Sequence, residues 1–179
     1  DAMPERIDAG VTMVANGTSR LVAKQLLEEA ARREALARLR SAPGVGALSS
    51  CDLIIEAATE NETVKRGIFE SLCPVLRPEV ILATNTSSIS ITRLAASTDR
   101  PGRFIGLHFM NPVPVMKLVE IIRGIATDEA VYQSASALVA RLGKIATTSE
   151  DYPAFIVNRV LLPMINEAIF TLYEGVGTV

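Results

Sequence analysis

Short apolar segments alternate with amphipathic segments along much of the chain, and this alternation constrains the fold more than any other feature. Apolar runs at residues 51–58, 80–88 and 103–109 each end in polar side chains. Such runs are typical of strands that are covered on both faces. Residues 62–76 and 90–98 lie between these runs and carry apolar side chains at helical spacing. Strands that alternate with helices form a largely parallel sheet, so we predict an α/β fold.

The remaining segments extend this pattern in both directions along the chain. Residues 5–40 are predicted to be helical, with Asn16–Gly17 as a candidate break. Two further strands are expected at 116–122 and 144–151. Two further helices are expected at 128–143 and 155–175.

Composition excludes several classes of partner. The chain has 179 residues, with 18 basic and 20 acidic side chains and a formal net charge of -2. The basic residues are scattered, so we expect neither nucleic acid nor a membrane as partner. Cys51 and Cys73 form no disulfide framework and have no zinc spacing, and we expect two free thiols, no metal and a cytoplasmic location. No apolar run approaches the roughly 18 residues of a membrane-spanning helix.

Polar residues gather where the predicted strands end. Glu60 follows the first strand, Asn85–Ser88 follow the second, and His108 and Asn111 lie at the end of the third. Open α/β sheets bind ligands beyond the carboxyl ends of their strands, so we predict a ligand site at this edge. Ordinary structural roles are the alternative: a turn or helix cap for Asn85–Ser88, and a capped helix start for Glu60 and Lys65.

His108 is the single histidine of the chain and sits in the apolar stretch "RFIGLHFMNPVPVMKLVEII". An imidazole with a pKa of about 6.5 is suited to proton transfer at physiological pH. Glu120 follows twelve residues later in the next predicted strand, where a buried carboxylate needs a partner. One hypothesis accounts for both residues: Glu120 accepts a hydrogen bond from one nitrogen of His108, and the other nitrogen faces a substrate. The alternatives are a structural histidine and a glutamate that points from an edge strand into water.

Two further sequence features bear on the site. Asn158 is an amide in an otherwise apolar helix and needs a hydrogen-bond partner, which could simply be a neighbouring helix. Two glycine pairs, at residues 44–46 and 175–177, resemble part of a dinucleotide-binding loop. Neither lies between a predicted strand and a predicted helix with the full spacing, so we reject both as nucleotide-binding motifs.

Three long motifs, "ATNTSSISITRLAA", "GLHFMNPVPVMKLVEIIRG" and "FIVNRVLLPMINEA", together resemble the L-3-hydroxyacyl-CoA dehydrogenases. The phrases "VEIIRGIAT" and "LLPMINEA" are most similar to the short-chain branch, the 3-hydroxybutyryl-CoA dehydrogenases. The resemblance implies a Rossmann-like, doubly wound, mostly parallel sheet over residues 1–150 that lacks its first strands and glycine loop. It also implies that residues 151–179 begin an all-helical dimerisation domain, and that the chain is part of a longer protein.

The resemblance also implies roles for individual residues. His108 resembles the catalytic base and Glu120 the carboxylate that orients it. Ser87 resembles the serine that contacts the substrate, and Asn158 the asparagine that completes the site from the helical domain. The expected cofactor is NAD, and the positions on its side of the site are Asp1, Glu60, Lys65, Asn85 and Asn111. The acid at Asp1 would hold the adenosine ribose, which favours NAD over its phosphorylated form.

The activity implied is the reversible, NAD-dependent oxidation of the 3-hydroxyl of a short-chain L-3-hydroxyacyl-CoA to a 3-ketoacyl-CoA. The implied protein is a homodimeric enzyme of fatty acid β-oxidation and butanoate metabolism. Two alternatives remain open: a non-catalytic scaffold or assembly fragment, and a related dehydrogenase that acts on a free hydroxy acid. The sequence also departs from the family pattern at Ala154, where a glycine is expected before "FIVNR".

Overall fold

The structure, a computed structural model, describes residues 3–178. Asp1, for which a cofactor role is predicted, lies outside the described residues. Internal contacts divide the chain into two compact units, residues 1–47 and residues 48–179. The predicted boundary near residue 150 between a nucleotide-binding domain and a helical domain stays a prediction.

The first unit contains two helices, α1 (Pro4–Ala23) and α2 (Glu29–Ala37). Helix α1 continues through Asn16–Gly17, so the candidate break at this point is wrong. A glycine inside a helix costs only about 1 kcal/mol relative to alanine, which is too little to end a helix of this length. The chain instead turns after α1, where Gln25 adopts a positive φ of 57°.

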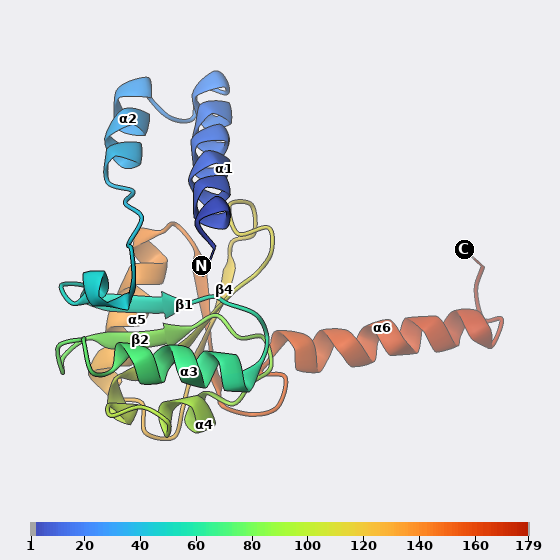
Figure 1. Ribbon diagram of the computed structural model, residues 1–179. Helices are drawn as coiled ribbons and strands as arrows, with labels where there is room; N and C mark the ends of the chain where they lie inside the picture. The colour runs from blue at the N-terminus through green and yellow to red at the C-terminus, as the bar shows by residue number, and fades with distance from the viewer. Residues whose placement is uncertain (1–2, 179) are drawn as a thin grey trace. The chain divides into compact units, whose positions relative to one another are not determined.

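The second unit is built on a five-stranded sheet in the order β1-β2-β3-β4-β5 (Figure 1). The strands are β1 (Leu53–Glu56), β2 (Ile81–Thr84), β3 (Phe104–Phe109), β4 (Leu118–Arg123) and β5 (Ile145–Glu150). Strands β1, β2 and β3 are parallel, β4 runs antiparallel to β3, and β5 is parallel to β4. The predicted α/β fold with a mostly parallel, Rossmann-like sheet is confirmed.

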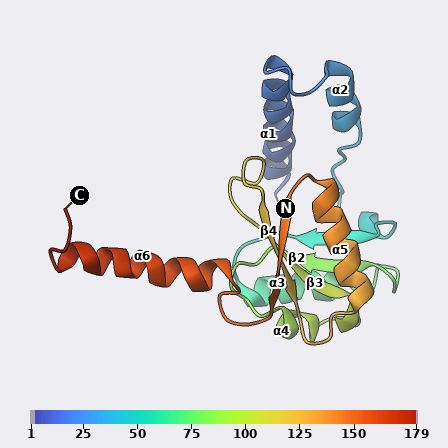
Figure 2. The same cartoon turned by 180° about the vertical axis from the view of Figure 1, so that it is seen from behind.

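Helices cover both faces of this sheet. The helical elements of the unit are α3 (Glu62–Leu72), α4 (Ile91–Ala95), η2 (Pro101–Arg103), α5 (Glu129–Arg141) and α6 (Val157–Tyr173), and the short helix η1 (Val45–Leu48) spans the boundary between the two units. Helices α3 and α4 lie on one face and α5 lies on the other, as Figure 1 and Figure 2 show. Because neighbouring strand residues point to opposite faces, Leu82 joins the α3–α4 core and Ala83 joins the α5 core. A sheet buried on both sides explains the continuous apolar runs of the sequence.

Gly106 in β3 allows α4 to pack closely on the sheet. A β-carbon at this position would lie 2.8 Å from Cδ1 of Ile91 and 2.9 Å from Cβ of Ile122. Glycine inside a strand often marks such a close approach. Helix α4 is therefore held close to strands β3 and β4.

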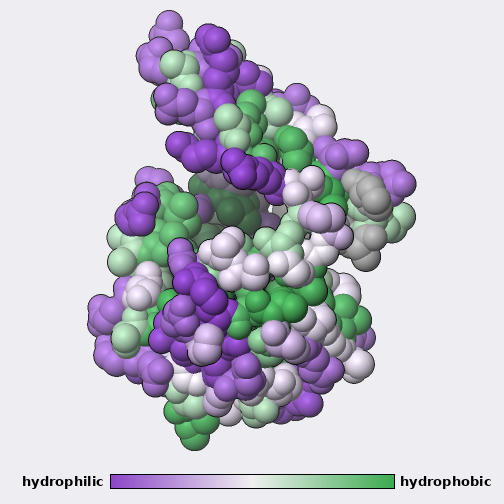
Figure 3. Space-filling model, turned by 60° about the vertical axis from the view of Figure 1, so that its left-hand side comes forward, coloured by the Kyte–Doolittle hydropathy of each residue, from purple (hydrophilic) through white to green (hydrophobic). Residues whose placement is uncertain are grey.

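Helix α6 differs from α3, α4 and α5, because none of its residues is buried. Its exposed large apolar side chains include Val160, Leu162, Met164, Ile165, Ile169 and Phe170. Elsewhere too, hydrophobic patches interrupt the hydrophilic surface on the face shown in Figure 3. Within residues 3–178, no helix combines the length and the apolar character that crossing a membrane requires.

Candidate active site

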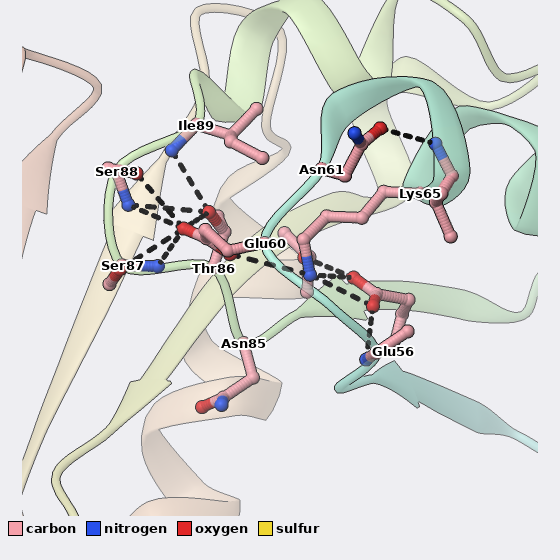
Figure 4. Close-up of polar contacts among 12 residues, drawn as sticks. Glu56, Glu60, Asn61, Lys65, Asn85, Thr86, Ser87, Ser88 and Ile89 are labelled. Carbon is pink, nitrogen blue, oxygen red and sulfur yellow. Dashed lines mark hydrogen bonds and ion pairs between the residues drawn. The ribbon is translucent and has the colours of Figure 1, made fainter. Parts of the chain in front are cut away.

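The turn that follows β2 wraps around a single carboxylate. One oxygen of Glu60, Oε1, accepts hydrogen bonds from the backbone N–H groups of Ser87 at 2.8 Å and Ser88 at 3.1 Å (Figure 4). The same oxygen accepts from the hydroxyls of Thr86 at 2.6 Å, Ser88 at 3.0 Å and Ser87 at 3.1 Å. The structure thus brings Glu60 and Ser87, both predicted site residues, into direct contact.

The surroundings of Glu60 favour its charged form. Partial burial raises the pKa of its carboxyl group, but the hydrogen bonds from Thr86, Ser87 and Ser88 outweigh that effect and leave the pKa below its usual value. A carboxylate that accepts several hydrogen bonds is stabilised as the anion. Glu60 therefore stays ionised at neutral pH and holds the turn in one shape.

A buried ion pair lies beneath this turn. The ammonium of Lys65 is 2.9 Å from both carboxylate oxygens of Glu56, and its Nζ lies 3.7 Å from Oε2 of Glu60. The side chain of Lys65 is only 1% exposed. Glu56 also accepts from the Thr84 hydroxyl at 2.6 Å and the Ala58 N–H at 2.5 Å. Lys65 thus has two carboxylate partners within the protein, and its predicted cofactor role stays a prediction.

Glu56 is a charged residue that the sequence analysis missed. It is the last residue of β1, where a carboxylate closes the apolar run "LIIE". A buried carboxylate needs compensation, and Lys65 lies nine residues later on α3. The signal was present in the sequence, because a charge at the end of a doubly covered strand calls for a partner.

His108 and Glu120 occupy directly opposite positions on the antiparallel strands β3 and β4. Nδ1 of His108 lies 2.7 Å from Oε2 of Glu120. The residues are 8% and 0% exposed, respectively. Strand β4 lies between β3 and β5, so the alternative of Glu120 pointing from an edge strand into water is wrong. Nε2 of His108 has no hydrogen-bond partner among the described residues.

The other oxygen of Glu120 holds the start of helix α6. Oε1 accepts from the backbone N–H groups of Ile156 at 2.9 Å and Val157 at 2.8 Å. One residue further on, the side-chain amide of Asn158 donates to the backbone carbonyl of Ser87 at 3.1 Å. The partly buried amide of Asn158 therefore bonds to the turn after β2 and not to another helix. Ser87, His108, Glu120 and Asn158 come from four separate segments and meet in one continuous set of contacts.

Two amide side chains mark the same edge of the sheet. Oδ1 of Asn85 accepts from the N–H of Phe109 at 2.9 Å, which ties the end of β2 to the end of β3. The Asn85 amide points away from Glu60 in Figure 4, and its NH₂ group donates to no described residue. Asn111 is exposed beyond β3. Unpaired amide donors at the carboxyl ends of parallel strands fit the polar groups of a nucleotide cofactor.

The described residues contain no cluster of three or more side chains suited to hold a metal ion. The cysteines, Cys51 and Cys73, are both free thiols.

One known protein family matches most of this chain. Residues 1–152 match the family described as 3-hydroxyacyl-CoA dehydrogenase, NAD binding domain. The chain belongs to this family. The family assignment agrees with the resemblance found in the sequence motifs, and it points to NAD as the cofactor.

Individual relatives agree with this assignment. The chain is 58% identical over 179 residues to 3-hydroxybutyryl-CoA dehydrogenase of Bradyrhizobium diazoefficiens, and it spans 61% of the length of that protein. It is 44% identical over 159 residues to 3-hydroxyadipyl-CoA dehydrogenase of Escherichia coli, with 89% of the chain and 33% of the relative covered. The crystal structure of (S)-3-hydroxybutyryl-CoA dehydrogenase from Ralstonia eutropha matches with a TM-score of 0.95 at 46% identity, covering 99% of the chain and 62% of that structure.

Proposed function

We propose that the protein catalyses the reversible, NAD-dependent oxidation of a short-chain L-3-hydroxyacyl-CoA to the 3-ketoacyl-CoA. The observation that carries this proposal is the hydrogen bond between His108 and Glu120, with no partner for Nε2 of the imidazole among residues 3–178. The family and the names of the relatives support the substrate class.

His108 acts as the general base in oxidation. Its Nε2 takes the proton of the substrate 3-hydroxyl, and Glu120 stabilises the imidazolium that forms. Bound NAD would supply the hydride acceptor for carbon 3, so that the alcohol would lose one proton and one hydride and become a ketone. In the reverse direction the imidazolium returns the proton to the ketone oxygen. Asn85 and Asn111 are the described residues proposed to hold the cofactor, with Glu60 and Lys65 beside them.

Ser87 and Asn158 position the substrate oxygen in this proposal. Glu60 keeps four other donors when the Ser87 hydroxyl turns away from it. The hydroxyl is therefore able to rotate toward a substrate oxygen and donate to it as charge develops there. Asn158, held at the carbonyl of Ser87, lies beside the same point.

Replacing His108 with glutamine in the intact protein tests the proposal. General acid–base catalysis contributes about 10²- to 10⁴-fold, so we expect the rate of acetoacetyl-CoA reduction by NADH to fall by about 10³-fold. Circular dichroism and saturable NADH fluorescence should stay unchanged, because His108 is proposed to act on the substrate and not to bind the cofactor. Activity near the wild-type level would refute the assigned base.

The same preparation separates the two alternative functions. A non-catalytic scaffold would show no saturable NADH binding in the wild-type protein. A dehydrogenase of free hydroxy acids would reduce acetoacetate at least as fast as acetoacetyl-CoA, whereas the proposed enzyme should prefer the thioester.

We further propose that the protein acts as a homodimer in the cytoplasm, in β-oxidation or butanoate metabolism. The exposed apolar residues of α6 support an association surface on this helix. Light scattering during size-exclusion chromatography measures the assembly directly, and a monomeric mass for the intact protein would contradict the dimer.

A further inference from the structure

We propose that Glu120 is a positioning residue with two separate tasks: one oxygen orients His108, and the other seats the start of α6 and thereby places Asn158. This inference rests on the proposed function, since it assumes that His108 and Asn158 serve the same substrate. It adds a task for Glu120 that concerns the backbone of the junction at residues 154–157 and not the imidazole.

The division of labour between the two carboxylate oxygens is the first observation. Oε2 faces Nδ1 of His108 at 2.7 Å, while Oε1 accepts from the N–H groups of Ile156 and Val157. The first N–H groups of a helix have no partner within the helix and need an external acceptor. A negative charge at this position is also favoured by the helix dipole. Glu120 supplies both the acceptor and the charge from a neighbouring strand.

The junction before α6 is the second observation. Ala154 and Phe155 both have left-handed backbone conformations, with φ of 67° and 52°. Each such residue costs roughly 1 kcal/mol when it is not glycine, so other contacts must hold the junction in place. Phe155 does this in part, because its side chain is buried and lies edge-on to the His108 ring. Helix α6 itself has no buried residue, so the contacts of its first turn carry the attachment.

Only a carboxylate can serve both sides of this arrangement. A glutamine at position 120 offers one oxygen and one NH₂ group. If the NH₂ group faced the junction, it would meet two backbone N–H donors without an acceptor. If the NH₂ group faced His108, Nδ1 would have to accept its hydrogen bond. In the neutral imidazole Nε2 would then carry the hydrogen and could not take a proton from the substrate. A Glu120→Gln variant must therefore give up one of the two tasks.

Hydrogen exchange at the junction, combined with kinetics, tests this inference in the intact protein. In Glu120→Gln we expect the backbone amides of Ile156 and Val157 to exchange at least about tenfold faster than in the wild type. A tenfold change corresponds to about 1.4 kcal/mol, the scale of the lost hydrogen bonds. The kcat for acetoacetyl-CoA reduction should fall, and the KM for acetoacetyl-CoA should rise because Asn158 is displaced.

Two matched variants separate the tasks. His108→Gln removes the imidazole and keeps the carboxylate, so it should lower kcat while exchange at Ile156 and Val157 stays within about twofold of the wild type. Glu150→Gln makes the same substitution at an exposed position of the neighbouring strand β5 and should change neither exchange nor kinetics. If Glu120→Gln does not fold, Glu120→Asp keeps the charge with a side chain that is one methylene shorter and cannot reach both partners. We expect faster exchange at the junction for this variant as well.

The outcomes for this inference and for the proposed function are distinct. One outcome is a folded Glu120 variant that has lost activity while the amides of Ile156 and Val157 exchange at the wild-type rate. That result would overturn the second task and leave the proposed function intact. Full activity in His108→Gln would overturn the proposed function, while the exchange rates would still report on the junction.

Discussion

Two carboxylates, Glu60 and Glu120, organise the carboxyl edge of the sheet in different ways. Glu60 has a side chain that is 38% exposed, and one of its oxygens accepts from three hydroxyls and two backbone N–H groups of a single turn, residues 86–88. Glu120 is fully buried, and it divides its two oxygens between a strand residue and the start of a helix. Both accept backbone N–H groups, yet the first shapes one segment and the second joins two.

The two carboxylates differ in how easily water can take over their hydrogen bonds when the side chain is removed. Water can hydrate the N–H groups and hydroxyls of Ser87 and Ser88 when Glu60 is lost, because these two residues are partly or fully exposed, although Thr86 is buried. Water cannot easily replace the contact of Glu120 with His108, because these residues are 0% and 8% exposed. Exposure therefore decides which of two similar hydrogen-bond arrangements is costly to disturb.

The largest effect is expected from comparing Glu120→Ala with Glu60→Ala. Removing Glu120 leaves a buried imidazole edge and two junction N–H groups unpaired, and we expect the free energy of unfolding to fall by about 3–5 kcal/mol. For Glu60→Ala we expect a loss of about 1–2 kcal/mol. Urea denaturation measures both values. Equal losses would show that exposure does not separate the two carboxylates.

The ion pair of Lys65 and Glu56 sharpens the comparison, because it is buried directly beneath Glu60. Lys65→Met should lower the free energy of unfolding by about 3 kcal/mol, since it leaves the Glu56 carboxylate without its cation. Glu56 keeps the donors Thr84 and Ala58, so complete unfolding is not expected. The double variant Glu56→Gln/Lys65→Met should be more stable than the sum of the single losses predicts. Strict additivity would contradict the coupling of the pair.

Acid titration provides a smaller test on the Glu60 side. The pKa of Glu60 is lowered in the folded state, so its stabilising contribution is present above the pKa of the unfolded chain and is lost as the pH falls through the folded value. We expect the stability gap between wild type and Glu60→Gln to be constant near neutral pH and to shrink below about pH 4.3, the ordinary value for glutamate. A gap that widens in acid would show that the charged form is not the stabilising one.

The smallest effect is expected at the junction that Glu120 holds. Ala154→Gly removes the cost of a left-handed alanine but increases the entropy of the unfolded chain, so we expect a net gain of about 0.5 kcal/mol. Ala137→Gly, in the middle of α5, is the matched control and should lose about 1 kcal/mol. Thermal denaturation of both variants checks the opposite signs. A loss at Ala154 would mean that its side chain makes contacts that outweigh the strain.

Much of this arrangement could be predicted from the sequence, for physical reasons that particular residues illustrate. The pairing of His108 with Glu120 was expected because two adjacent apolar strands each carried one polar residue that needed a partner. The contact of Glu120 with Ile156 and Val157 could not be predicted, because it depends on backbone N–H groups that every sequence contains. It also depends on positive φ values at Ala154 and Phe155, which their side chains disfavour.

The pairing register of β3 and β4 has a consequence for how this site could diversify. His108 and Glu120 face each other because the two strands are aligned residue by residue, and the loop from Met110 to Lys117 that joins them takes no part in that alignment. Lys144 holds this loop separately, through the carbonyls of Val113 and Met116. Insertions or exchanges in the loop can therefore change the surface beyond β3 and β4 without moving the pair of His108 and Glu120. Under the proposed function, such changes would leave the proton-transfer groups in place.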